Sequence, residues 1–459
     1  MSNKCIWSFN CGAGRQRHTW NFDSLNPAYV TSSGHGGRSP HSYTGYQRPE
    51  AFHECGYWQE EYMKLHREIL SGKRPPRYLI AVLPESGLAD QLFGIISLFF
   101  WALLTGRAFQ ITAGYQQISP LETAFDAPFI NWTRPAGDPK VLTEHLYAKF
   151  KGKREYPPTH ALLPNISDYG SMFLVNIWNG AYKFYSSADL NTIPEGGGNK
   201  SVLFVAANRG AVYGIFDNPH HIEELSDAGL RPDTAFSCAF RFLFNLNNVT
   251  TQASETQLAE MHFNASHDTQ YSLQSERSLL QAPRLLRIGI QIRVGDTVYN
   301  ASAKPEDIRL QDYKSFFDCA LQIQEHRRTA PTTRIVWYLL SDSHRLKQLA
   351  LEEFGRDVLV TDTTPNKHVV TSINGGNPNL DNERADTLVK AAADMLSFAE
   401  MDYFVLSQKS GFGKVGAMLS NRWHNVWWLN PQDHRNRTPS CGPKSYVKLS
   451  DLAGKWSGF

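Results

Sequence analysis

An arginine stands at the end of an apolar, β-branched run in the second half of the chain. In the segment IGIQIRVGD (288–296), Arg293 alternates with isoleucines, which predicts a cation at the point where a buried strand leaves its sheet. A buried cation needs an anionic partner, either a structural carboxylate or a bound anion. A guanidinium can grip a phosphate through two parallel N–H donors. The segment therefore predicts a phosphate or diphosphate contact at Arg293, flanked by Gln291 and Asp296.

A glycine-rich segment, SGFGKVG (410–416), follows another predicted strand and opens a predicted helix. Glycines let the backbone approach an anion, and the first N–H groups of a helix are free to bind it. The spacing also matches the GxGxxG dinucleotide fingerprint, which requires an acidic residue about 20 positions later, and Asp433 lies near that distance. Capping and close packing of a helix would explain the same glycines. The candidate anion contacts here are Ser410, Gly411, Phe412 and Gly413, of which the phenylalanine could equally belong to the core.

Three further candidates follow predicted strands. The segment PESGLADQLFG (84–94) places Asp90 in the first turn of an apolar helix, where it either caps that helix or acts as a base. Asp342 ends the strand of LLSDS, and its position makes it a candidate ligand contact. His368 lies between two later strands, where it is either structural or close to a bound base or phosphate.

Several common chemistries are missing from the sequence. It contains no HExxH, GxSxG or Walker lysine motif, and no Asp-X-Asp of the kind that holds a metal against a diphosphate. We therefore expect a nucleotide diphosphate to bind through Arg293 and residues 410–413 without a divalent metal.

Composition sets the class of protein. The 459 residues carry 46 Lys+Arg against 44 Asp+Glu, a net charge of +2, which argues against a general nucleic-acid binder. A hydrophobic content of 41% is enough for folded cores, and the length predicts two domains. The longest apolar run, 93–104, is too short to span a bilayer and predicts a buried helix.

Cysteines and sequons indicate a compartment. The six cysteines are scattered without zinc-site spacing, and their pairing is open. Seven Asn-X-Ser/Thr sites favour a luminal protein over coincidence. The first residues show no signal peptide, so we expect either an anchor upstream of this chain or a soluble cytosolic protein. The seven sites are Asn131, Asn165, Asn199, Asn248, Asn264, Asn300 and Asn436.

Strand and helix patterns alternate in both halves of the chain, which predicts two doubly wound, Rossmann-like α/β domains with a cleft between them. Residues 1–54 are predicted to be a flexible, stem-like extension, and the two domains are placed at 55–275 and 276–435. A polar stretch from Val249 to about Arg277 is expected between them, and 436–459 form a tail that packs back. Predicted strands start near Arg77, Ala108, Ser201, Arg287, Arg334, Asp357, Asp402 and His424.

Four segments resemble fucosyltransferases, most closely the plant xyloglucan-type branch. They are SGLADQLFGIISLFFWALLTGRAF, NRGAVYGIF, IGIQIRVGD and FVLSQKSGFGKVGAML. Gln291 stands where many members have His, as in the plant branch. Ala89 and Asp90 replace the usual Gly-Asn, and no residue clearly corresponds to a catalytic carboxylate.

The resemblance implies a GT-B fold and an inverting, metal-independent transfer of fucose from GDP-fucose to a glycan hydroxyl, on a cell-wall polysaccharide or a glycoprotein. It also implies a Golgi enzyme held by an N-terminal anchor. Arg293 would neutralise the departing diphosphate, and the candidate bases are Asp296, then Asp90, with water or leaving phosphate as the alternative. The expected donor contacts are Gln291, Arg293, Asp342, His368, Ser410, Gly411, Phe412 and Gly413.

Three alternatives remain open at this point. They are the same fold with another nucleotide sugar, a non-catalytic carbohydrate-binding relative, and a nicotinamide-dependent oxidoreductase. The acceptor, its linkage and the oligomeric state are not predicted.

Overall fold

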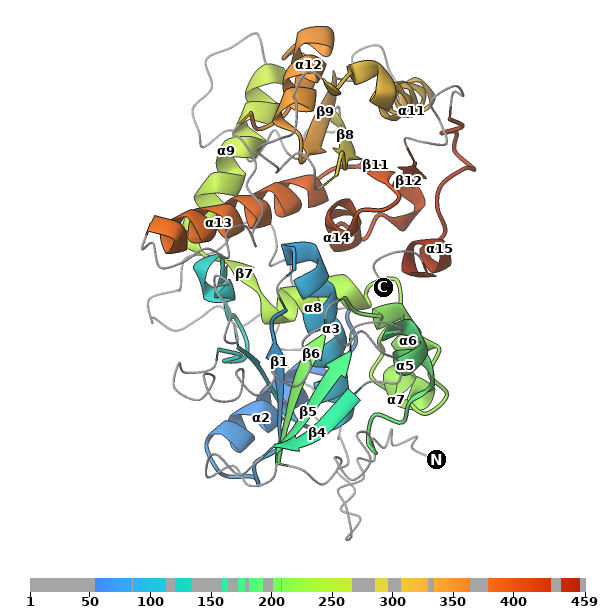
Figure 1. Cartoon of the computed structure of the whole chain (residues 1–459). Helices are drawn as coiled ribbons and strands as arrows, with labels where there is room; N and C mark the ends of the chain where they lie inside the picture. The colour runs from blue at the N-terminus through green and yellow to red at the C-terminus, as the bar shows by residue number, and fades with distance from the viewer. Residues whose placement is uncertain are drawn as a thin grey trace, which may run out of the picture.

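Two α/β lobes make up the described part of the protein (Figure 1). The structure is a computed structural model. It describes residues 54–84, 86–112, 120–133, 159–163, 172–177, 181–192, 201–207, 209–265, 285–295, 307–328, 334–363, 379–430 and 439–454. Each lobe is built on one five-stranded sheet, which confirms the predicted α/β class with two doubly wound units.

The first sheet has the order β2-β1-β6-β5-β4 and is parallel except for β4, which pairs antiparallel with β5. All five residues of β1, YLIAV, are buried, as expected for a parallel strand covered on both faces. The strands are β1 (Tyr78–Val82), β2 (Ala108–Thr112), β4 (Thr159–Leu163), β5 (Met172–Ile177) and β6 (Val202–Ala207).

The second sheet has the order β10-β9-β8-β11-β12 and is parallel throughout. Along β9 the buried side chains alternate between two apolar clusters, with Val336 and Tyr338 on one side and Trp337 and Leu339 on the other. The strands are β8 (Leu285–Ile292), β9 (Arg334–Ser341), β10 (Leu359–Val360), β11 (Tyr403–Ser407) and β12 (Val426–Leu429).

Helices cover the sheets. Those of the first lobe are α2 (Gln59–Leu70), α3 (Leu88–Leu104), α5 (Ala181–Ser187), α6 (Val212–Phe216), α7 (Ile222–Asp227) and α8 (Ala235–Leu243). Those packed around the second sheet are α9 (Asn248–Ala265), α11 (Lys314–Arg327), α12 (His344–Phe354), α13 (Asn379–Ala399) and α14 (Gly411–Leu419), with α15 (Leu449–Gly454) near the end. A short antiparallel pair, β3 (Phe125–Asp126) and β7 (Asn245–Leu246), joins two segments that are far apart in the chain.

The apolar run predicted to be a buried helix is α3, and every residue of it except Asp90 is buried. The helix packs between its own sheet and α14 of the second lobe, so apolar surface is removed from water on all sides. In the portion of the chain that is described, no helix is long and apolar enough to cross a membrane.

One expectation needs correction. The stretch from Val249, expected to be a polar connection, begins with the 18-residue helix α9. This helix lies beside α13 in Figure 1 and is joined to the second lobe by the Ser254–Ser397 hydrogen bond of 3.0 Å. Packing of a few buried positions against α13 stabilises a helix that shows almost no amphipathic pattern. Residues 266–284 lie outside the described part, so the predicted domain boundary remains a prediction.

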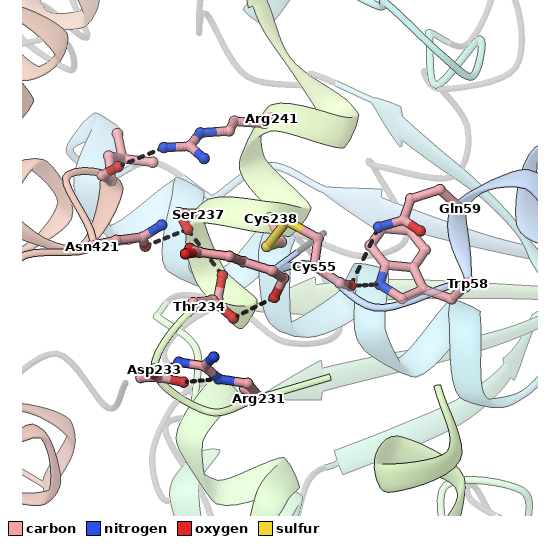
Figure 2. Close-up of a disulfide and its surroundings, with 12 residues drawn as sticks. Cys55, Trp58, Gln59, Arg231, Asp233, Thr234, Ser237, Cys238, Arg241 and Asn421 are labelled. Carbon is pink, nitrogen blue, oxygen red and sulfur yellow. Dashed lines mark hydrogen bonds and ion pairs between the residues drawn. A yellow bond between two sulfur atoms is a disulfide. The ribbon is translucent and has the colours of Figure 1, made fainter. Parts of the chain in front are cut away.

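Two disulfides tie distant segments together. Cys319 of α11 pairs with Cys441, and Cys55 pairs with Cys238 of α8. Figure 2 shows that α8 also turns Ser237 and Arg241 toward the second lobe, where Ser237 Oγ donates to Asn421 Oδ1 at 2.5 Å. Arg241 donates to the carbonyl of Leu419 at 3.3 Å. The same helix is therefore anchored covalently in one lobe and hydrogen-bonded to the other.

Candidate active site

The candidate site lies where the strand order reverses in each sheet. Counted in chain order, the strands of the second sheet run 3-2-1-4-5, so the reversal lies between β8 and β11. In the first sheet β1 has β2 on one side and β6 on the other. Ligands of open α/β sheets bind outside the carboxyl ends of strands at such reversals. The segments after β1, β6, β8 and β11 carry Asp90, Arg209, Arg293 and the glycine segment 410–413.

The ends of β8 and β11 are hydrogen-bonded to each other through Ser407. Its Oγ accepts from the backbone N–H of Arg293 at 2.8 Å and donates to the carbonyl of Gln291 at 3.2 Å. The side-chain Oε1 of Gln291 accepts from the N–H of Ser407 at 3.3 Å. Gln291 is buried. It therefore joins two strand ends, and this contact explains its burial without a ligand.

Asp342 is a buried carboxylate that holds the segment carrying Arg293 in place. Its carboxylate accepts from the N–H groups of Val294 at 2.8 Å and Gly295 at 3.0 Å, and lies 3.1 Å from Nη1 of Arg293. Burial raises the pKa of Asp342. The positive charge of Arg293 opposes this rise most, and the backbone N–H donors oppose it less. Its side chain is 5% exposed against 31% for Arg293. The guanidinium thus has a structural partner on one side and an accessible face on the other.

Asp90 reaches the second lobe from the first turn of α3. A methyl group placed on Gly411, the first residue of α14, would lie 3.6 Å from Oδ1 of Asp90. Burial raises the pKa of Asp90, while Arg209, Arg293 and Lys414 each oppose the rise. One carboxylate therefore lies among three cations from two lobes, next to a helix N-terminus.

Sequence reasoning missed two of those cations, Arg209 and Lys414. Arg209 follows β6, and its Nε lies 3.9 Å from Oδ1 of Asp90. Lys414 is buried in α14, with its Nζ 5.4 Å from the ring centre of Trp428. The available signal was position alone, since both residues stand just after predicted strand ends, and Lys414 lies inside the glycine segment itself.

The glycines of 410–416 serve packing as well as any ligand. A Cβ on Gly413 would lie 2.8 Å from Oε1 of Gln291, and one on Gly416 would lie 2.7 Å from the ring of Phe398. Ser410 is buried and Phe412 packs partly buried against the core. Because Gly413 and Gly416 have no side chains, α14 can pack closely against β8 and α13. The GxGxxG spacing therefore does not by itself indicate a dinucleotide.

Two predicted site residues, Asp296 and His368, lie outside the described residues. Among the residues that are described, no group of three or more His, Cys, Asp or Glu side chains could hold a metal ion. The site as described therefore consists of Asp90, Arg209, Gln291, Arg293, Asp342, Ser410, Gly411, Phe412, Gly413 and Lys414.

Comparison with known proteins gives structural matches only. No family model and no curated protein sequence matches the chain. The fucosyltransferase FUT1 of Arabidopsis thaliana, solved as a point mutant in complex with GDP, matches with a TM-score of 0.52 and 16% identity, over 83% of this chain and 80% of that one. The fucosyltransferase NodZ from Bradyrhizobium matches with a TM-score of 0.38 and 11% identity, over 78% of this chain and 96% of that one. The first match confirms the expected GT-B fold of two facing Rossmann-like units.

Proposed function

We propose that the protein is an inverting, metal-independent glycosyltransferase that moves fucose from GDP-fucose to a hydroxyl group of a glycan. The observation that carries this proposal is the convergence of four strand ends from two sheets on one cluster of cations, at the reversal point of each sheet. The similarity in fold to a fucosyltransferase solved with GDP favours that donor over other nucleotide sugars.

The chemistry requires a cationic site for the leaving group. The acceptor oxygen forms a bond to the anomeric carbon of fucose from the face opposite the diphosphate. The bond between that carbon and the phosphate oxygen breaks, and its electron pair leaves with GDP. Arg293, held by Asp342, would stabilise the charge that develops on the diphosphate. The free N–H groups of Gly411 to Gly413 would add to this at the start of α14.

The acceptor hydroxyl must lose its proton during transfer. Asp90 is suited to accept it, because burial raises the pKa of this carboxyl toward the working range of a base while its cationic neighbours keep it ionisable. Asp296 is the other candidate. Each is replaced by asparagine in turn, and turnover is measured across pH. Replacement of the true base should abolish the acidic limb of the pH profile.

Secretory localisation, in the Golgi lumen, is part of the proposal. Two disulfides support an oxidising compartment. The sequon residues Asn131 and Asn248 are both exposed, as glycan acceptors must be.

The test combines binding with product analysis. Thermal unfolding is followed with GDP, UDP and NAD, each with and without EDTA, and the protein is then incubated with GDP-fucose and a panel of plant-type and protein glycans. Stabilisation by GDP alone, unchanged by EDTA, together with a fucosylated product supports the proposal. Stabilisation by UDP would indicate another nucleotide sugar, and stabilisation by NAD an oxidoreductase. GDP binding without any product would indicate a non-catalytic relative.

A further inference from the structure

Arg209 holds a backbone conformation that its side chain disfavours. Its φ is 74°, in the left-handed region where a Cβ crowds the following carbonyl. Asn421 is the other non-glycine residue with positive φ among those described. Strained backbone of this kind persists only where neighbouring contacts enforce it, and it concentrates at functional sites.

The contacts that enforce this conformation come from α3. The N–H of Arg209 donates to the carbonyl of Asp90 at 3.2 Å, and the N–H of Ala211 donates to Oγ of Ser97 at 2.8 Å. Between them, Gly210 lies so close to α3 that a Cβ would come within 1.9 Å of the carbonyl of Phe93. The segment after β6 is therefore fixed on the first turns of α3, and Arg209 has one defined position relative to Asp90.

That position brings a second arginine to the edge of the second lobe. The side chains of Arg209 and Arg293 are each 31% exposed, and both act on Asp90. Arg209, Arg293 and Lys414 all act on Asp90, and Arg293 also lies 3.1 Å from Asp342, so cations of both lobes gather around one carboxylate. An anion that bears two or three charges would be attracted to these cations from both lobes.

We infer that Arg209 is a diphosphate-binding residue supplied by the first lobe, so that the nucleoside diphosphate is held between an arginine of each lobe. The identity of the nucleotide as GDP rests on the proposed function. The role inferred for Arg209 concerns only the diphosphate group of that nucleotide. Arg293 approaches from the end of β8 and Arg209 from the end of β6. A glycine would adopt the backbone at position 209 without strain, so an arginine there is explained by the use of its side chain.

The test measures binding of GDP, GMP and inorganic pyrophosphate by titration calorimetry. Arg209→Gln is expected to lower the affinity for GDP and for pyrophosphate at least about 10-fold, because a charge-assisted contact to phosphate is lost. GMP, which lacks the second phosphate, should change less than about 3-fold. The matched control is Arg334→Gln, which removes an exposed arginine at the first residue of β9, at the end of that strand opposite Asp342. It should leave all three affinities unchanged.

A second variant separates binding from folding. Arg209→Gly should fold and melt close to the temperature of the unmodified protein, because relief of the left-handed strain offsets the lost contact with Asp90. It should lose diphosphate affinity as Arg209→Gln does. Equal losses for GDP and GMP, or no loss of pyrophosphate affinity, would overturn the assignment. If the unmodified protein binds pyrophosphate through Arg209 but shows no preference for GDP, the proposed donor is wrong while the role of Arg209 stands.

Discussion

At the residue scale, Arg293 carries the proposed chemistry. Asp342 holds its guanidinium at 3.1 Å, so the cation is positioned before any ligand arrives. A preorganised donor of this kind lowers a barrier by about 3–4 kcal/mol. Arg293→Ala should therefore reduce turnover at least about 100-fold in steady-state assays, with an unchanged circular dichroism spectrum. Arg293→Lys should recover little of this loss, because an ammonium group cannot make the two-pronged contact. A folded alanine variant with normal turnover would remove Arg293 from the mechanism.

Asp90 is predicted to cost stability at neutral pH. Its folded-state pKa is raised above the unfolded value by burial, so its contribution to stability is full below the unfolded pKa and is lost as the pH rises through the folded pKa. Asp90→Asn removes that cost, so the gain in melting temperature over the unmodified protein should be larger at pH 7 than at pH 4. The same variant should have a lower turnover. Melting curves at the two pH values test this, with Asp227→Asn, an exposed residue at the end of α7, as the control.

At the element scale, the packing of α2 on β2 depends on a neutral histidine. His66 is buried, its Nε2 lies 2.9 Å from the carbonyl of Phe109, and burial lowers its pKa from 6.5 to about 4. Stability from this group is therefore present above pH 6.5 and lost as the pH falls toward 4. At about 1.4 kcal/mol per pKa unit, the loss is about 3 kcal/mol.

Denaturant unfolding between pH 7 and pH 4 tests the role of His66. The unmodified protein should lose stability over this range, and His66→Gln should flatten that part of the pH dependence because glutamine can donate to Phe109 without titrating. A variant that loses stability with acid as steeply as the unmodified protein would assign the effect to other groups.

At the scale of the whole molecule, the disulfide Cys55–Cys238 stabilises the helix that joins the lobes. The cysteines are separated by 183 residues, so their link restricts a large part of the unfolded chain. Replacing both by serine should cost about 2–5 kcal/mol of unfolding free energy. It should also weaken GDP binding, since α8 carries the Ser237–Asn421 and Arg241–Leu419 contacts (Figure 2).

The matched control replaces Cys319 and Cys441, which link α11 to the chain end within the second lobe. That pair should cost a similar free energy while leaving GDP affinity within about 2-fold. Equal effects of both pairs on GDP affinity would show that the Cys55–Cys238 link acts through global stability only.

The sequence by itself determined the periodic elements and much of the site. Alternation of buried strands with helices predicted all five strands of the second sheet and β1, β2 and β6 of the first, because strand and helix periods are local properties. It did not predict β4 or β5. The position of Arg293, Asp342 and the glycine segment after their strands predicted that they would meet, since parallel strands end at one edge. Asp90 was identified in the same way.

Only the tertiary structure decided what depends on contacts between distant segments. α9 has no helical pattern of its own and is stabilised by α13. The pairing of Cys55 with Cys238 could not be deduced from spacing. The positive φ of Arg209 is imposed by its docking on α3, and its approach to Asp90 joins strand ends more than 100 residues apart in the chain. Such approaches depend on packing free energy summed over many residues, which a local sequence pattern does not encode.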